Sequence, residues 1–304
     1  MRIACKNTFT TATVLALSAC GGSGGGGGAG GPGDLFFGST TATASGNGLQ
    51  FANFGGSAAD LDGQTVNIRL PRTIVRDAPG ETEKGVFDGV ITFDDGQTLV
   101  VDGETLVFTG GTATRADGSE VRINTFSTGF GFEPQVFRVL ADGERGGRAG
   151  EIEFAHFIIG AETVPDAIPE LTGSVSYTGN VFGLLSVRGI ADASEVSGTI
   201  NLTATFDGGQ VSGDAALSSG GATFDFELTP VGITGNGFVG DLNVTACSTG
   251  PCTSDSQIGG VFFGRTAGTI GGILDLDLTL EDPDGVVDDI NLVGNAGFVA
   301  GETR

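Results

Sequence analysis

The stretch TINLTATFD, residues 199–207, decides the fold because apolar and polar side chains alternate along it at every step. Ile200, Leu202, Ala204 and Phe206 share one face, and the threonines, asparagine and aspartate between them share the other. A period of two with one polar face is typical of an antiparallel strand that packs on a core on one side and meets water on the other. The stretch therefore predicts a half-buried strand.

The same alternation recurs on both sides of this stretch and predicts an all-β fold. The clearest further runs are residues 222–228, 238–246 and 274–280, and less regular ones are 66–70, 87–93, 106–108 and 121–123. Glycine pairs suited to tight hairpin turns separate the later runs, at 208–209, 220–221 and 235–237. No run of comparable length follows a helical period.

The composition favours a binding or structural protein over an enzyme. The 304 residues include 56 glycines and 22 phenylalanines but one histidine, and the net charge is −23. One histidine excludes sites that need two imidazoles, and the negative charge argues against nucleic acid as a partner. No nucleophile–base pair and no metal-ligand cluster can be assembled, so we predict no enzymatic activity, no catalytic residue, no metal and no cofactor.

The first residues have the parts of an export signal. Arg2 and Lys6 precede the weakly apolar run TATVLAL (11–17), which is too short to span a membrane. The sequence LSAC, residues 17–20, resembles the lipobox of bacterial lipoproteins, whose cysteine is acylated. An ordinary signal peptide with an accidental cysteine is the alternative. The resemblance implies a signal peptide over residues 1–19 and lipidation of Cys20, which would hold the protein on a membrane.

A glycine-rich tether, residues 20–33, follows the signal and has nothing to pack. In this respect the sequence resembles lipoproteins of the outer membrane, because the residue after Cys20 is Gly21 and not Asp. The resemblance implies an outer-membrane destination, and the protein could face either the periplasm or the cell exterior. Loss of residues 1–19 removes two basic residues and no acidic one, which leaves a net charge of −25.

Two β domains are expected beyond the tether. Residues 164–170 (VPDAIPE) contain two prolines and no strand pattern, and they mark the predicted boundary between domains 34–170 and 171–304. The first domain holds 9 basic and 21 acidic residues, and the second holds 3 basic and 16 acidic residues. The two halves therefore differ in charge as well as in regularity.

The stretch GGVFFGRTAGTIGG, residues 259–272, resembles the late-strand motif of the transferrin-binding protein B family of surface lipoproteins. Gly268 and Thr269 replace the family's usual acidic pair, and Arg265 stands where proline is common. The matching positions are Phe262, Phe263, Gly264, Ala267, Gly271 and Gly272.

This resemblance covers residues 171–304 and only loosely the half before it. It implies a handle-like antiparallel sheet followed by an eight-stranded antiparallel β-barrel, which factor H binding protein shares. The family's ligand contacts lie in variable loops, so no binding residue is carried over to this chain. An integral outer-membrane barrel is the rival interpretation, but it calls for aromatic girdles, and this chain has one tyrosine and no tryptophan.

The remaining candidate sites are few. Cys247 and Cys252 flank a short turn and are expected to form a disulfide in an oxidising compartment. His156 shares its strand face with apolar residues and is expected to be a core residue rather than a base. The acidic cluster 281–289 lacks the spacing of a calcium loop, so a solvated hairpin tip is the favoured interpretation.

Two weaker patterns complete the set. The sequence GNGFVG (235–240) matches a dinucleotide fingerprint, but a strand follows it instead of a helix, so a hairpin turn is expected. Arg69, Arg72 and Arg76 are expected to form ordinary surface pairs with Asp77 or Glu81.

Two functions remain. The first is an outer-membrane lipoprotein that binds a protein or a small solute, such as an iron source, through loops of its β domains. The alternative is a structural or adhesive envelope lipoprotein with no discrete ligand. The negative surface favours a cationic or neutral partner, and the ligand-binding residues cannot be named from the sequence.

Overall fold

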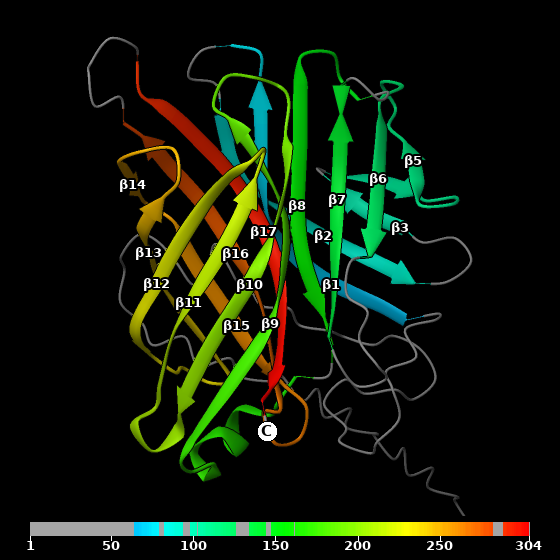
Figure 1. Cartoon of the computed structure of the whole chain (residues 1–304). Helices are drawn as coiled ribbons and strands as arrows, with labels where there is room; N and C mark the ends of the chain where they lie inside the picture. Colours follow the sequence, from blue (N-terminus) through cyan, green and yellow to red (C-terminus); the bar gives the residue numbers. More distant parts are fainter. Residues whose placement is uncertain are drawn as a thin grey trace, which may run out of the picture.

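The protein consists of two antiparallel sheets that lie side by side in the computed structural model (Figure 1). The structure describes residues 64–78, 82–93, 98–101, 103–125, 134–143, 147–160, 162–281 and 288–303. The predicted signal peptide, Cys20 and the tether lie outside these residues. The predicted all-β fold, a handle-like sheet followed by a closed barrel, is confirmed.

The first sheet, called the handle sheet below, contains eight strands in the order β4-β3-β2-β1-β8-β7-β6-β5. The strands are β1 (Gln64–Arg76), β2 (Thr82–Phe93), β3 (Thr98–Val101), β4 (Glu104–Val107), β5 (Thr112–Thr114), β6 (Glu120–Thr125), β7 (Gln135–Asp142) and β8 (Glu151–Ile159). The two end strands are consecutive in the chain. They meet at a tight turn in which Gly110 and Gly111 both have positive φ, a conformation that glycine adopts without steric cost.

The handle sheet therefore curls around an apolar interior. Residues from six of its strands form one buried cluster there: Leu99, Val101, Leu106, Phe108, Ala113, Val121, Ile123, Phe137, Val139, Ala141, Ala155 and Phe157. The rings of Phe137 and Phe157 stack with centroids 5.0 Å apart. Burial of these side chains holds the curl closed.

The second sheet is a barrel that follows the 3-10 helix η2 (Pro165–Glu170). Its strands are β9 (Ser174–Val187), β10 (Ser194–Thr205), β11 (Gln210–Ser219), β12 (Ala222–Gly232), β13 (Gly237–Cys247), β14 (Cys252–Ser254), β15 (Gln257–Phe263), β16 (Thr269–Leu280) and β17 (Ile290–Glu302). Strand order is β16-β15-β13-β12-β11-β10-β9-β17, and β17 pairs again with β16, so eight strands close a ring. The short β14 extends the line of β15 along β16.

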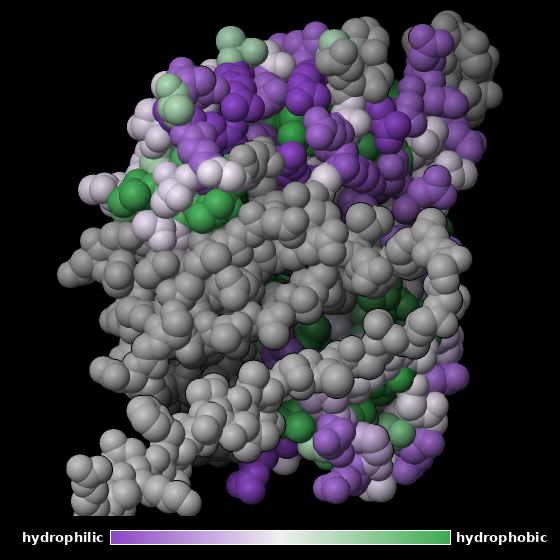
Figure 2. Space-filling model, turned by 180° about the vertical axis from the view of Figure 1, so that it is seen from behind, coloured by the Kyte–Doolittle hydropathy of each residue, from purple (hydrophilic) through white to green (hydrophobic). Residues whose placement is uncertain are grey.

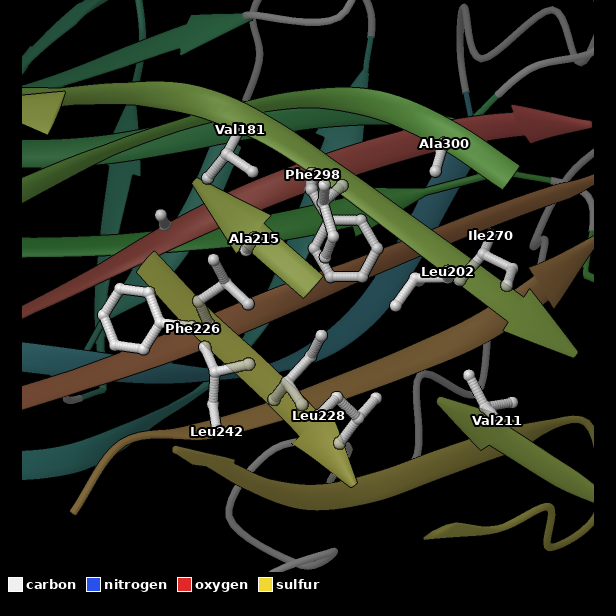
Figure 3. Close-up of a cluster of buried hydrophobic side chains, with 14 of the residues drawn as sticks. Val181, Leu202, Val211, Ala215, Phe226, Leu228, Leu242, Ile270, Phe298 and Ala300 are labelled. Carbon is white, nitrogen blue, oxygen red and sulfur yellow. The ribbon is translucent and has the colours of Figure 1, made fainter. Parts of the chain in front are cut away.

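Alternate side chains of the barrel strands fill its interior, as Figure 3 shows for Val181, Phe226, Leu228 and Phe298. Phe262 lies at the centre of an aromatic group with Phe206, which is 5.5 Å away between ring centroids. The barrel core is thus a packed apolar interior.

At two positions in the barrel, neighbouring strands approach so closely that only glycine fits. A Cβ at Gly179 would overlap the backbone of Val299 on the neighbouring strand, and a Cβ at Gly272 would overlap the carbonyl oxygen of Gly259. Because the strands approach this closely, glycine is required at both positions.

The structure corrects two details of the strand predictions. Strand β10 ends at Thr205, and Phe206 begins the short 3-10 helix η3 (Phe206–Gly208), although its side chain remains buried. Ala246 was expected on the inner face of β13 but is exposed. The register with β12 shifts between Asp225 and Phe226, so the alternation of faces changes at this bulge.

The outer faces of β9, β16 and β17 pack against β1, β7 and β8 of the handle sheet. Val75, Leu140, Ile152, Phe154, Leu184 and Val293 form a buried cluster between the sheets. Lys84 of the handle sheet pairs with Asp275 and Asp277 of the barrel at 3.1 and 3.3 Å. Apolar packing and ion pairs together fix one sheet on the other.

Candidate functional site

A concave patch, called the wall groove below, lies on the outer surface of the barrel and has a volume of about 580 Å³. Its lining residues come from β11, β12 and β13: Ser212, Gly213, Asp214, Ala215, Ala216, Asp225, Phe226, Glu227, Leu228, Pro230 and Thr245. In the closed ring β11 and β12 lie opposite β16 and β17, the strands that contact the handle sheet. The wall groove therefore lies on the side of the barrel away from the handle sheet, over β11 and β12, which are in the foreground of Figure 1.

Two irregularities in strand pairing shape the wall groove. The register of β11 with β12 shifts between Val211 and Gly213, and that of β12 with β13 shifts between Asp225 and Phe226. A bulge bends its strand and increases the local twist. Thr245 donates to the carbonyl oxygen of Asp225 at 3.1 Å, which ties the second bulge to the neighbouring strand.

The groove is acidic, and its carboxylates face one another. Asp214 lies directly opposite Glu227 in the strand register. Like charges at directly opposed positions destabilise a sheet. Asn201 donates to Asp214 at 2.9 Å on one side of this pair, and Asn243 lies opposite Glu227 on the other. Asp214, Asp225 and Glu227 form no ion pair within the described part of the chain, and no lysine or arginine lines the groove.

Basic side chains are concentrated elsewhere. Those with ion pairs in the structure are Arg72, Arg76, Lys84, Arg115, Arg122, Arg138, Arg148 and Arg188, and all but Arg188 belong to the handle sheet or its turns. Arg188 pairs with Asp277 at 3.0 Å, next to the handle sheet. The charge asymmetry between the halves of the sequence therefore leaves the barrel wall opposite the handle sheet negative.

The disulfide between Cys247 and Cys252 is present and lies beside the groove. It joins the end of β13 to β14, with a Cα–Cα distance of 6.2 Å. The amide of Ser248 in the bridged turn donates to the carbonyl oxygen of Thr223 at 3.0 Å. The bridge thus fixes the turn that begins two residues after Thr245.

His156 is buried between the two sheets, as expected for a core residue. Its Nδ1 contacts Oδ1 of Asn295, and Nδ2 of Asn295 donates to Oγ1 of Thr73 at 3.0 Å. Complete burial, with a contribution from Arg138, lowers the pKa of His156 to about 3, so the imidazole is neutral at physiological pH. The side chain links barrel and handle sheet and does not reach the groove.

The arginines of β1 differ from expectation. Arg72 pairs with Glu153 at 3.2 Å and Arg76 pairs with Glu151 at 3.0 Å, instead of the sequence neighbours expected. The reason is the strand register, which places β8 beside β1 and brings its glutamates within reach. The Arg69 side chain lies outside the described residues.

The other sequence candidates form no site in the described part of the chain. Residues 235–240 contain the turn between β12 and β13, with Thr234 and Gly237 paired across it, as predicted. Residues 282–287 of the acidic cluster lie outside the described residues. Among the residues that the structure describes, no three His, Cys, Asp or Glu side chains are grouped to hold a metal.

No helix in the described ranges has the length and apolar character needed to cross a membrane.

No protein-family model and no curated protein matches this chain. Solved structures do. They include a variant of the vaccine antigen transferrin binding protein B from Haemophilus parasuis Hp5, with 16% identity, a TM-score of 0.42 and coverage of 78% of this chain and 45% of that chain. Intact Ap-TbpB is 16% identical with a TM-score of 0.41, and the match covers 78% of this chain and 47% of that chain. The isotype 1 protein from serogroup B Neisseria meningitidis is 14% identical with a TM-score of 0.39, and the match covers 79% of this chain and 44% of that chain.

All three are transferrin-binding protein B. This is the family whose motif residues 259–272 resemble. The chain spans less than half the length of each. With TM-scores of 0.39–0.42, the fold assignment rests on the strand pairing described above and not on these similarities.

Proposed function

We propose that this protein is an outer-membrane lipoprotein that binds a cationic protein segment, without catalysis, on the outer wall of its barrel. The lipobox-like sequence at Cys20 supports membrane attachment, and the tether of residues 20–33 leaves the β domains free to meet a partner. The ligand is expected on the barrel wall, whereas the sequence had pointed only to unspecified loops.

One observation carries the proposal. The opposed carboxylates of Asp214 and Glu227, with Asp225 nearby, line a concave surface that contains no basic residue. A lysine or arginine placed between Asp214 and Glu227 would turn their repulsion into attraction. The small side chains of Gly213 and Ala216 leave room for an extended segment to approach the strands.

The chemistry of the partner follows from the charge. Exposed carboxylates act on a partner over about 8 Å at physiological ionic strength, so binding should weaken as salt rises. Complementary charge chiefly increases the association rate and the selectivity for basic partners. A nucleic acid would be repelled.

Binding can be tested with a fluorescent oligolysine peptide and anisotropy. The double substitution Asp214→Asn/Glu227→Gln should weaken binding at least about tenfold, because it removes two charge-assisted contacts. The control Asp166→Asn/Glu170→Gln removes the same net charge from exposed positions on η2. Equal losses in both variants, or no peptide binding at all, would contradict a binding role for the wall groove.

Membrane attachment is tested separately by Cys20→Ser. The variant should leave the membrane fraction, since serine cannot carry the lipid proposed for Cys20. Cells are fractionated and the membranes washed with high salt and carbonate. A variant that remains in the washed membranes would show that another segment holds the protein there.

A further inference from the structure

Eight side chains of alternating charge are connected end to end in the handle sheet. We call them the ion-pair ring, and in order they are Arg115, Glu153, Arg72, Glu83, Arg76, Glu151, Arg148 and Asp117. They come from β1, β2, β8 and the turns before β6 and β8. Where β8 begins, at the upper end of Figure 1, hydrophilic residues gather on the surface seen from behind (Figure 2).

In the inner half of the ring, Arg115, Glu153 and Arg72 are largely shielded from solvent, whereas Glu83 is half exposed. Arg115 Nη2 lies 2.7 Å from Glu153 Oε2, and the other oxygen of Glu153 lies 3.2 Å from Arg72 Nη1. The Arg115 and Glu153 side chains are only 4% and 3% exposed. Arg72 then reaches Glu83 at 4.0 Å, and it lies over Gly85, whose missing side chain leaves space for the guanidinium.

The outer half is open to solvent. Arg76 lies 3.3 Å from Glu83 and 3.0 Å from Glu151. Arg148 lies 3.5 Å from Glu151 and 2.7 Å from Asp117. The Arg148 and Asp117 side chains are 48% and 43% exposed. Water and salt therefore reach this half but not the Arg115–Glu153 pair.

Both ends of the series lie in one turn, which closes the ring. Arg115 and Asp117 belong to the turn between β5 and β6, where the Arg115 amide donates to the Ser119 carbonyl oxygen at 2.8 Å. Hydrogen bonds from Ser119 and Arg148 hold the pKa of Asp117 below its ordinary value, so Asp117 stays ionised at neutral pH. The turn is thus attached at two points to the β7–β8 side of the sheet.

The same turn lies at the end of the handle sheet's apolar interior. Ala113 and Val121, which flank the turn, are members of the interior cluster. On β8, Ala155 and Phe157 belong to this cluster. Glu153 lies two residues before Ala155 and therefore on the same, inward face of the strand. The Arg115–Glu153 pair therefore lies across the end of the apolar interior.

We propose that the turn 115–119 is a lid on the handle sheet's interior, held by two ion pairs that respond differently to salt. The inner pair is Arg115–Glu153, and the outer pair is Asp117–Arg148. Salt screens exposed pairs strongly and buried pairs weakly. Salt alone therefore loosens the lid, and the interior opens only when the inner pair is lost. This inference is independent of the partner proposed for the barrel.

Hydrogen exchange of the full chain, followed by mass spectrometry, tests the lid. In the unmodified protein, 1 M NaCl should raise the exchange of lid amides about threefold. Arg148→Gln should raise it by a similar factor at low salt and abolish the further response to salt. Arg115→Met should raise it at least tenfold and increase binding of the dye ANS, while amides of the barrel strands keep their protection.

Arg122→Gln is the matched control, because Arg122 lies on the same hairpin and pairs locally with Glu120 at 3.3 Å. It should change neither lid exchange nor the salt response. Lid exchange that ignores both Arg115→Met and Arg148→Gln, or that rises equally in the barrel, would overturn the proposal. Should Arg115→Met fail to fold, the salt response of Arg148→Gln decides, and a response equal to that of the unmodified protein overturns it.

Discussion

The barrel and the handle sheet solve the same problem, a closed antiparallel surface around an apolar interior, in different ways. The barrel closes by backbone pairing alone, since β17 joins β16 on one side and β9 on the other. In the described part of the handle sheet, the edge strands β4 and β5 are joined at the Gly110–Gly111 turn, where Thr109 pairs with Thr112. Side chains such as Arg115 and Glu153 connect strands across the open end of the sheet.

Charge follows the same division. In the handle sheet, acidic and basic side chains are used against one another in the ion-pair ring. On the barrel wall, acidic side chains have no basic counterpart among the described residues that line the groove. The barrel's outer carboxylates that lie near the handle sheet are paired with basic residues, whereas Asp214, Asp225 and Glu227 on the opposite wall form no ion pair among the described residues.

The largest expected effect breaks the barrel. Phe262→Ala removes a fully buried ring whose neighbours include Tyr177 at 6.3 Å between centroids. A cavity of this kind costs about 3–5 kcal/mol of unfolding free energy. Denaturant unfolding measures it, and Val107→Ala, at an exposed handle position, should change stability by less than about 0.5 kcal/mol. Similar losses of unfolding free energy in both variants would contradict a major contribution of the Phe262 side chain to the barrel core.

The second effect tests the contact between the two sheets. Burial lowers the pKa of His156 from 6.5 to about 3, so the unfolded chain binds the proton more readily. The contribution of His156 to stability is complete above pH 6.5 and is lost as the pH falls toward 3, by about 2 kcal/mol at pH 5.

Other carboxyl groups titrate in the same range, so the measurement is a difference. Unfolding free energies of the unmodified protein and of His156→Gln are compared from pH 7.5 to pH 4. The unmodified protein should lose more stability than the variant as the pH falls. Parallel curves would show that His156 is not buried as a neutral base between the sheets.

The third effect concerns the edge of the wall groove. Replacing Cys247 and Cys252 by serine opens a loop of few residues, so the loss of unfolding free energy is at most about 2 kcal/mol. Oligolysine binding should weaken as well, because the bridged turn begins two residues after Thr245, which lines the groove. Thiol labelling of the denatured, unreduced protein should modify neither cysteine.

The smallest expected loss of stability concerns the ion pairs between the handle sheet and the barrel. Lys84→Gln removes a partly exposed contact to Asp275 and Asp277 across the two sheets. Burial raises the pKa of Asp275 despite this lysine. Pairs of this exposure contribute up to about 1 kcal/mol, which should shrink in 1 M NaCl. A loss well above that value, or one insensitive to salt, would place the pair among the buried ones.

The sequence predicted what depends on local alternation and missed what depends on register. Strand β13 was predicted, but the bulge that turns Ala246 outward has no signature in its own residues. His156 was expected in the core, yet its partner Asn295 lies 139 residues away. A disulfide between cysteines five apart needed no register, which is why that pairing could be predicted.

The candidate site was less accessible to sequence reasoning than the fold. The acidic excess of the second half was visible, but its concentration opposite the handle sheet requires the strand order of the closed barrel. Asp214 and Glu227 face each other because the Gly220–Gly221 turn pairs Ser219 with Ala222, and this register continues without a break to Gly213. The glycine pair at 220–221 thus carried the signal for this pair, but the concave surface around it also needs β13, which that hairpin does not position.

Strand β17 has a consequence for the order in which the chain can complete its fold. It is the last strand in chain order, and Leu292 pairs with Val187 of the first barrel strand. Its other face presents Asn295 to His156 of the handle sheet. Neither the barrel nor its seat on the handle can be completed until this strand has emerged, and such distant pairings form slowly. The first barrel strand, β9, therefore keeps one edge unpaired until β17 is available, and the last of the described strands completes the fold.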